Sequence, residues 1–364
     1  MKLHPREFAL ARAHAGQQDF EALTTNQVHL VMERGRTLYK WFKSHPGTHN
    51  LINGLVVVSI FAADGWVLMG LPAFFLAAGE ENSTWLILLA SCAVGSVHSW
   101  LLYSLTVFSL HEGAAHDTIF VGTGPLRTVG RFLGRNLCRI ASAEPHQYAE
   151  CHMAHHAKFG TEADSEFLNF VLPRRYWLTF LPFATFINFT DFLAHRPLTY
   201  TRNRLISAAM GLLYNGAYAV LMYRWFGAAF TLITMLVFLP HVGFYIDRVR
   251  QFTEHNLMPL DNRNGARSFG VGFWGLLIGG GPWGQPCHLV HHMVASLPWY
   301  QQIALHRYFT RLLTPRQRQQ FLVAPVIGFP RLLWRIVREA NRFVREQGHH
   351  VGNEDRRQEQ TAER

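Results

Sequence analysis

Long apolar segments limit what this chain of 364 residues can fold into. Each is about 20 residues or longer, enough for a helix to cross the hydrocarbon core of a bilayer. A helix also satisfies its own backbone polar groups there, where no water is available. We therefore predict an all-α integral membrane protein with about four transmembrane helices. The segments are Leu51–Ala78, Trp85–Leu110, Leu205–Tyr223 and Phe226–Ile246.

Three histidine clusters lie beside these segments. The first is a pair separated by four residues, and the other two have the spacing His-x-x-His-His. Positions i, i+3 and i+4 share one face of a helix, so each triplet can direct three imidazoles to one place. Imidazole suits borderline transition metals, and one zinc ion could not use so many ligands. The clusters therefore predict a helical cap that holds two metal ions. Their members are His111 and His116; His152, His155 and His156; and His288, His291 and His292.

Structural roles for these histidines are the weaker explanation. A lone histidine on an apolar face is usually a hydrogen-bonded core residue, and a histidine tag is contiguous. These clusters instead alternate with long apolar stretches. His98, His146, His195 and His241 match none of the clusters, and His98 is expected to be a hydrogen-bonded structural residue within a span.

The order of the clusters resembles the histidine boxes of the membrane fatty acid desaturase family and its hydroxylase and ketolase relatives. The likeness extends from about residue 51 to residue 300 and includes the flanks of the boxes. Tyr148 precedes the second box, Gly160–Asp164 follows it, and Pro298-Trp299-Tyr300 follows the third. The family's second box usually continues to Asp-Pro, whereas Ser165 follows Asp164 here, which leaves the metal assignment intact.

The resemblance implies a diiron centre that uses dioxygen to attack an unactivated C–H bond. Zinc has no redox chemistry and would not serve. Arg250–His255 resembles the family's additional ligand segment, which adds a ninth histidine to the eight of the boxes. The implied iron ligands are His111, His116, His152, His155, His156, His255, His288, His291 and His292.

Four polar residues lie beside these ligands. Gln251 is one helical turn before His255, where some family members place a residue that reaches the metal through water. Glu112, Asp164 and Glu254 lie next to or shortly after ligand histidines. A carboxylate there can accept the second imidazole N–H and fix the ring's tautomer. Surface solvation, or a salt bridge to a nearby arginine, is the competing explanation.

The boxes must meet on one side of the membrane, so an even number of crossings should separate the second from the third. The pair of spans within 205–246 supplies two. The segment 176–194, which contains Pro182, Asn188 and Asp191, is therefore expected to be interfacial. Arginines concentrate between boxes one and two and after residue 300. By the positive-inside rule, both termini and the active site should be cytoplasmic.

Four regions follow from these patterns. They are a cytoplasmic N-terminal segment (1–50), a membrane desaturase-like domain (51–300), cytoplasmic basic amphipathic helices (301–347) and a disordered tail (348–364). The N-terminus has no secretory pattern. The four cysteines form no CxxC pair, which fits a reducing compartment. We expect a bacterial inner-membrane protein.

Charge and composition leave several functions open. The net charge of +10 is carried mostly by loops beside apolar spans, which favours an anionic membrane surface over nucleic acid. The leading hypothesis is desaturation of a fatty acyl chain. A hydroxylase or carotenoid-type ketolase would begin with the same hydrogen abstraction. A membrane transporter or metal-binding scaffold is the alternative from another class.

An oxygen-dependent enzyme of this kind would also need an external electron carrier, such as a ferredoxin, rubredoxin or cytochrome.

Overall fold

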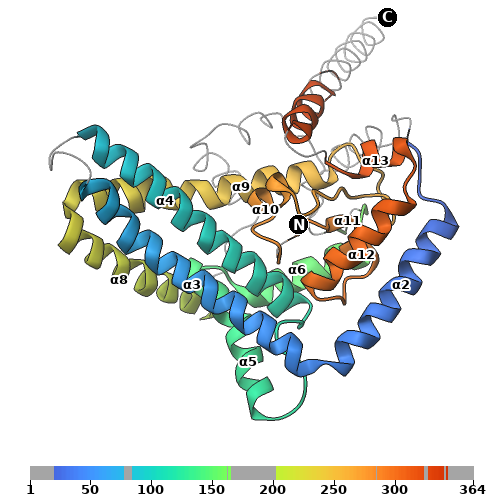
Figure 1. Ribbon diagram of the computed structural model, residues 1–364, viewed down its shortest axis with the longest axis horizontal. Helices are drawn as coiled ribbons and strands as arrows, with labels where there is room; N and C mark the ends of the chain where they lie inside the picture. Colours follow the sequence, from blue (N-terminus) through green and yellow to red (C-terminus); the bar gives the residue numbers. More distant parts are fainter. Residues whose placement is uncertain are drawn as a thin grey trace, which may run out of the picture.

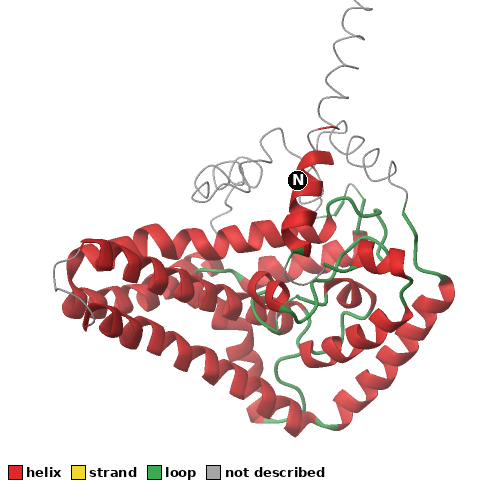
Figure 2. Ribbon diagram, turned by 45° about the horizontal axis from the view of Figure 1, so that its top comes forward, coloured by secondary structure: helices red, strands yellow, loops and turns green. Residues whose placement is uncertain are grey.

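The computed structural model describes residues 20–77, 84–161, 163–164, 202–283, 285–323, 327–339 and 342. Every regular element within these ranges is a helix, and the only β-type pairing there is an isolated bridge between Ser268 and Leu322. Figures 1 and 2 show long helices gathered at one end of the molecule and short helices with loops at the other. The segment 176–194 and the tail 348–364 lie outside the described residues.

The long helices are α3 (Pro46–Ala77), α4 (Thr84–Val107) and α8 (Arg202–Leu232), together with α9 (Leu239–His255). Two π-helical stretches extend them: η1 (Phe108–Ala115) continues α4, and η5 (Ile233–Phe238) joins α8 to α9. Three helical stretches are long and apolar enough to cross a membrane. They are Pro46–Phe75, Thr84–Ala115 and Arg202–His255.

The third stretch is bent sharply at Gly227. Its 54 residues would measure about 80 Å as one straight helix, far more than a bilayer core requires. Gly227 has φ 82° and ψ 177°, which interrupts the helix. Figure 1 shows the arms before and after this position running back beside each other, and α8 contacts η5. The two segments expected as spans within 205–246 lie on the two arms, and the expectation of four crossings counts this one candidate stretch as two.

Exposed apolar side chains cover the outside of the long helices. Leu55, Val58 and Phe74 of α3 and Leu212 and Leu213 of α8 are 58–74% exposed. Soluble proteins rarely expose contiguous apolar surface on this scale. The buried residues lie mainly on α4, which packs between α3 and the bent helix. The arrangement is that of a membrane protein whose outer face contacts lipid.

Asp64, a carboxylate in the middle of α3, is buried between helices. It accepts a hydrogen bond from the hydroxyl of Tyr214 (2.7 Å), and its Oδ1 lies 2.5 Å from Nδ1 of His98. These residues come from α3, α8 and α4. A polar contact of this kind joins helices in a medium that offers no competing water. His98 is therefore a hydrogen-bonded structural residue, as the sequence predicts.

The other helices, most of them short, form a second packed region, which we call the short-helix region. Its core contains Val31, Leu289, Leu305, Phe309 and Phe321, all fully buried. The region packs at the end of α4 and α9 that carries the first histidine box and His255 (Figure 1). Its helices are α2 (Thr25–Ser44), α5 (Pro125–Asn136), η2 (Leu137–Ala141), α6 (Pro145–Lys158), α10 (Phe273–Ile278), α11 (His288–Met293), α12 (Trp299–Leu312), α13 (Pro315–Phe321) and a helix over 328–339.

Candidate metal centre

The first histidine box lies on a π-helix, and this local geometry brings its two members together. In an α-helix, residues five apart point in different directions. In η1 the amide of His116 instead donates to the carbonyl of His111 (3.1 Å), which is the i to i+5 bond of a π-helix. The two imidazole rings are consequently 4.8 Å apart between centroids. Single π-turns within α-helices are common at functional sites.

The other two boxes lie on α6 and α11, where the triplet spacing places all members on one side. The side chain of Glu144 caps α6 by accepting from the amides of His146 and Gln147. Within each box, the members divide between two groups of ligand atoms. A ninth imidazole, His255, comes from the last residue of α9.

The first group contains His111, His116, His152 and His291, whose ligand nitrogens lie within 4.8 Å of one another. Nε2 of His111 is 3.1 Å from Nε2 of His291, and Nε2 of His116 is 3.1 Å from Nε2 of His152. His156 joins this group, because its Nε2 is 2.8 Å from that of His291 and 3.1 Å from that of His152.

The second group contains His155, His255 and His292, and an overlapping set contains Glu254, His255 and His288. Nε2 of His288 lies 2.9 Å from Nε2 of His255 and 3.2 Å from Nε2 of His292. The rings of His156 and His292 are 4.7 Å apart, so the two groups are neighbours. The structure therefore brings all nine predicted histidines together.

The spacing of these nitrogens fits metal coordination better than hydrogen bonding. Five Nε2 atoms follow one another in the order His111, His291, His156, His152 and His116, with four contacts between them. An imidazole Nε2 carries one hydrogen or one lone pair, whereas the Nε2 atoms of His291, His156 and His152 each have two contacts, so these contacts cannot all be hydrogen bonds. Two nitrogens bound to one ion at about 2.0–2.1 Å lie about 2.9–3.4 Å apart, which is close to the separations found here.

Burial disfavours the protonated form of several box imidazoles. It lowers the pKa of His288, His291 and His292 well below the ordinary value, and neighbouring imidazoles add to the effect. Burial, with the charge of His152, lowers the pKa of His116 to about 3. A metal ligand must offer an unprotonated nitrogen, so the environment prepares these rings to bind a cation.

Two of the predicted carboxylates lie against histidines that are predicted ligands. Asp164 Oδ1 is 2.8 Å from Nδ1 of His155, and its other oxygen accepts from the amide of Gly160 (3.0 Å). Glu112 Oε1 is 3.2 Å from Nδ1 of His111, and Thr118 donates to the same carboxylate. Both arrangements leave Nε2 directed at the cluster, as expected for a carboxylate that fixes the ring.

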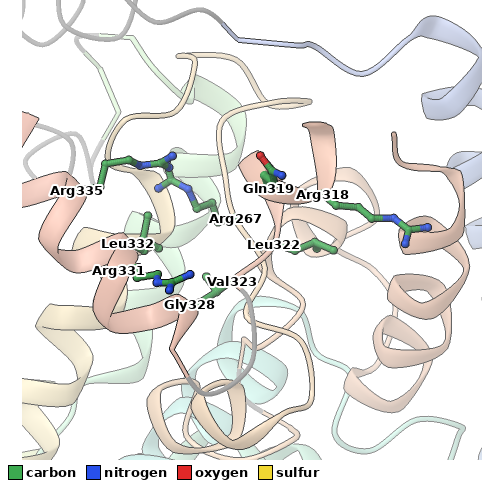
Figure 3. Close-up of a pocket in the computed structure, with 9 residues that line it drawn as sticks. All are labelled: Arg267, Arg318, Gln319, Leu322, Val323, Gly328, Arg331, Leu332 and Arg335. Atoms are coloured by element: carbon green, nitrogen blue, oxygen red, sulfur yellow. The ribbon is translucent and has the colours of Figure 1, made fainter. Parts of the chain in front are cut away.

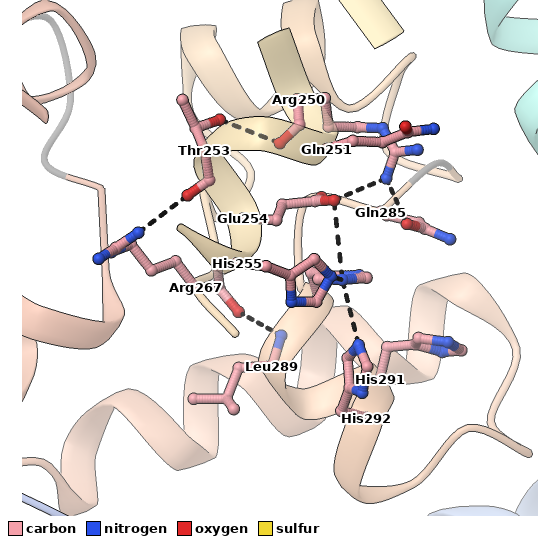
Figure 4. A network of polar contacts seen from close by, with 12 residues as sticks. Arg250, Gln251, Thr253, Glu254, His255, Arg267, Gln285, Leu289, His291 and His292 are labelled. Carbon is pink, nitrogen blue, oxygen red and sulfur yellow. Dashed lines mark hydrogen bonds and ion pairs between the residues drawn. The ribbon is translucent and has the colours of Figure 1, made fainter. Parts of the chain in front are cut away.

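Glu254 lies closer to the centre than its predicted supporting role requires. Its Oε2 is 3.7 Å from Nε2 of His288, and it belongs to one of the possible ligand sets. Arg250 donates to the same oxygen (2.8 Å) and to Gln285 (2.5 Å), as Figure 4 shows. Arg250 is 5% exposed, so this is a buried ion pair at the edge of the histidine cluster.

Gln251 does not join either ligand group. Its amide donates to Asp247 (2.9 Å), one turn back along α9. Two other contacts to the ligands were missed in the sequence. Nδ1 of His255 is 3.0 Å from the carbonyl of Gly265, and Nε2 of Gln302 is 3.4 Å from Nδ1 of His291. Gln302 closely follows the Pro298-Trp299-Tyr300 flank of the third box, which is the one signal that could have indicated it.

Three other histidines, His98, His146 and His241, do not enter the cluster. His98 bonds to Asp64 between the long helices, and His146 is exposed at the start of α6. His241 is buried on α9, more than three turns before His255. His195 lies outside the described residues.

Comparison with known families agrees with the geometry. The model of the fatty acid desaturase family matches residues 83–324, which include all three boxes, His255 and Glu254. Comparison with curated proteins gave no match. The chain belongs to the fatty acid desaturase family, and it is a membrane oxidoreductase that acts on fatty acids.

Proposed function

We propose that this protein desaturates a fatty acyl chain at a diiron centre, using dioxygen and electrons from a separate carrier. The observation that supports it best is the convergence of nine imidazoles in two adjacent groups. Two irons bound there would supply dioxygen activation and hydrogen removal from the acyl chain. An imidazole set with flanking carboxylates fits iron, since soft thiolate ligands are lacking among the described residues of the cluster.

A cavity beside the first ligand group supports an acyl substrate. It has a volume of about 510 Å³, within the usual range for small-molecule pockets. Leu102, Val107 and Leu110 of α4 and η1 form an apolar wall. Leu110 directly precedes His111, and Tyr148, which also lines the cavity, stacks on His152 at 5.3 Å. The cavity would hold an acyl carbon near the ligands while the protein excludes water.

The chain's own residues would set the outcome of the reaction. Tyr148 and the two carboxylates, Glu112 and Asp164, hold ligand rings in place. The cavity wall would fix which carbon approaches the metal ions. Hydroxylation would begin with the same hydrogen removal, and a displacement of about one ångström is enough to change such an outcome.

Lipid mass spectrometry tests the reaction directly. Cells that express the chain should accumulate acyl chains two mass units lighter, and cells that express His155→Ala should not. Purified protein should consume oxygen only with iron and a reductant present. Acyl products sixteen mass units heavier would show that the protein hydroxylates the acyl chain and does not desaturate it. If oxygen consumption depended on neither iron nor the reductant, the protein would be neither an iron-dependent desaturase nor an iron-dependent hydroxylase.

Filling the cavity should separate substrate binding from metal binding. Thr106 lines the cavity, and its hydroxyl donates to the carbonyl of Leu102 on its own helix. A Thr106→Trp protein should keep its iron but lose about 100-fold in product formation, because the acyl chain cannot reach its reactive position. Leu89→Trp is the matched control, since Leu89 is 57% exposed on the same helix. Equal amounts of product from both variants would show that the cavity does not bind the acyl substrate.

The four-crossing topology gives a prediction that does not depend on catalysis. In single-cysteine versions of the protein, labels at Asn50 and Asp261 should react from the cytoplasm. A label at Arg224, beside the bend at Gly227, should react only from the opposite face. The two arms of the bent helix would then be two crossings. Labelling of positions 224 and 261 from the same face of the membrane would show that the two arms are not two separate crossings.

A further inference from the structure

A second pocket lies between α13, the helix over 328–339 and the loop that carries Arg267 (Figure 3). Its volume is about 470 Å³. Four arginines line it beside a short apolar wall, and no carboxylate is among its described lining residues. Neither the proposed reaction nor the histidine boxes use it. The residues that carry the argument are Arg267, Arg318, Arg331, Arg335, Leu322 and Leu332.

Arg267 forms a fixed positive floor for this pocket. The residue is 2% exposed, and its guanidinium donates to the backbone carbonyls of Thr253 (3.0 Å) and Asn256 (2.5 Å). Those bonds hold the group in one place but bring no negative charge. Burial, with the nearby charge of Arg335, lowers the pKa of Arg267 to about 9. Figure 3 shows the two guanidinium groups directed toward each other.

Protein carboxylates balance little of this charge. Glu339, one turn further along the same helix, acts on Arg335 through its charge, but its carboxylate pairs with Arg338 (3.1 Å). Neither Arg318 nor Arg331 has an ion-pair partner among the described residues. Guanidinium groups that face one pocket without acids are suited to an oxyanion, which each of them can contact through two N–H groups.

The pocket lies where the long helices meet the short-helix region. Phe329, Leu332 and Ile336 pack against Val249 and Phe252 at the end of α9. The same rim exposes large apolar side chains: Phe273 is 65% exposed, Ile327 54% and Trp334 70%. Exposed aromatic residues beside arginines are characteristic of the membrane interface. A ligand at this position would therefore come from the lipid surface.

We propose that this pocket binds the phosphate group of an anionic phospholipid. Arg331 and Arg335 would contact the phosphate oxygens, and Leu322 and Leu332 would accept the first carbons of the lipid. Phe273 and Trp334 would lie among the neighbouring lipids. The site would hold the helix over 328–339 against the membrane, with Arg267 beneath it linking the pocket to the backbone around His255.

Lipid retention by the purified full-length protein tests this site. The protein is equilibrated in neutral detergent with equal phosphatidylglycerol and phosphatidylcholine, and the retained lipid is counted by mass spectrometry. The wild type should retain phosphatidylglycerol in preference. Arg331→Gln and Arg335→Gln should each weaken that retention about fivefold, the effect of one lost arginine contact at a membrane surface. Both side chains are exposed, so folding should survive.

Arg338→Gln is the matched control, because it removes the same charge from the same helix without lining the pocket. It should retain phosphatidylglycerol as the wild type does. Equal losses for all three variants would reduce the effect to general surface charge and overturn the site. A wild type with no preference between the two lipids would also overturn it. Inorganic phosphate should not displace the lipid at millimolar concentration; displacement there would assign the pocket to a soluble phosphate instead.

Discussion

A His255→Ala protein should contain little iron and form no measurable product, although this histidine lies outside the three boxes. Nε2 of His255 is 2.9 Å from Nε2 of His288, and the carbonyl of Gly265 holds its other nitrogen at 3.0 Å. The loss of this imidazole opens a coordination position in the second group. Even residues that merely orient ligands cost about 10–100-fold in metal affinity or activity when they are changed, so the loss of a ligand should cost at least as much.

Two other histidines provide controls for this variant. His146→Ala removes an exposed imidazole from α6, and His241→Ala removes a buried one from the same helix as His255. Both should retain iron and turnover, although His241→Ala should lower the thermal unfolding midpoint because the side chain is buried. Iron and product are measured for all three variants in the same preparation. Full iron content and normal turnover in His255→Ala would show that His255 is not a ligand. The eight box histidines would then be the only imidazole ligands proposed for the centre.

Replacement of Arg250 by methionine should produce the largest loss of stability. Arg250 bonds to Glu254 (2.8 Å) and Asp247 (3.0 Å) while only 5% exposed. Removal of one partner from a buried ion pair costs about 3–5 kcal/mol, because the remaining charge has no compensation. Glu254 also lies 3.7 Å from Nε2 of His288, so the iron content should fall as well.

The exposed ion pair of Arg338 and Glu339 is the control for the loss of stability expected in Arg250→Met, because it differs from the Arg250 pair in burial. The side chain of Arg338 is 65% exposed, and an exposed pair of this kind contributes about 0–1 kcal/mol. Arg338→Met should therefore leave the thermal unfolding midpoint nearly unchanged. The midpoints of both variants are measured in the same detergent. A shift of equal size for the two would contradict the structural role given to the Arg250 pair.

Helical spacing alone predicts that the members of the second and third boxes lie on one side of a helix, but the expectation that each triplet converges on one place was wrong, because each box divides between two ligand groups. His152, His155 and His156 are close in sequence, and any helix through them places them on one side. The long apolar segments are equally local, since length and hydropathy define them. Family membership followed from the same local patterns, and the match over residues 83–324 confirms it.

Features that depend on the backbone or on distant partners were less predictable. His111 and His116 converge through a π-helix, which no residue pattern in the first box indicates. Gly227 was not distinguished from the other glycines, yet its left-handed conformation bends the third apolar stretch. Gln251 has the expected position on α9, but Asp247 on the same helix binds its amide. Glu254 came closer to the metal ligands than predicted because Arg250, one turn earlier on α9, binds its carboxylate. Arg250 is itself bonded to Gln285, which is distant in sequence.

Metal analysis of the purified protein tests the central claim most directly. If nine imidazoles hold two redox-active ions, protein purified gently without chelators should contain about two irons per chain and little zinc. His255→Ala prepared in parallel should contain clearly less. One tightly bound zinc per chain, with no iron and no gain when iron is supplied, would contradict a diiron oxidoreductase.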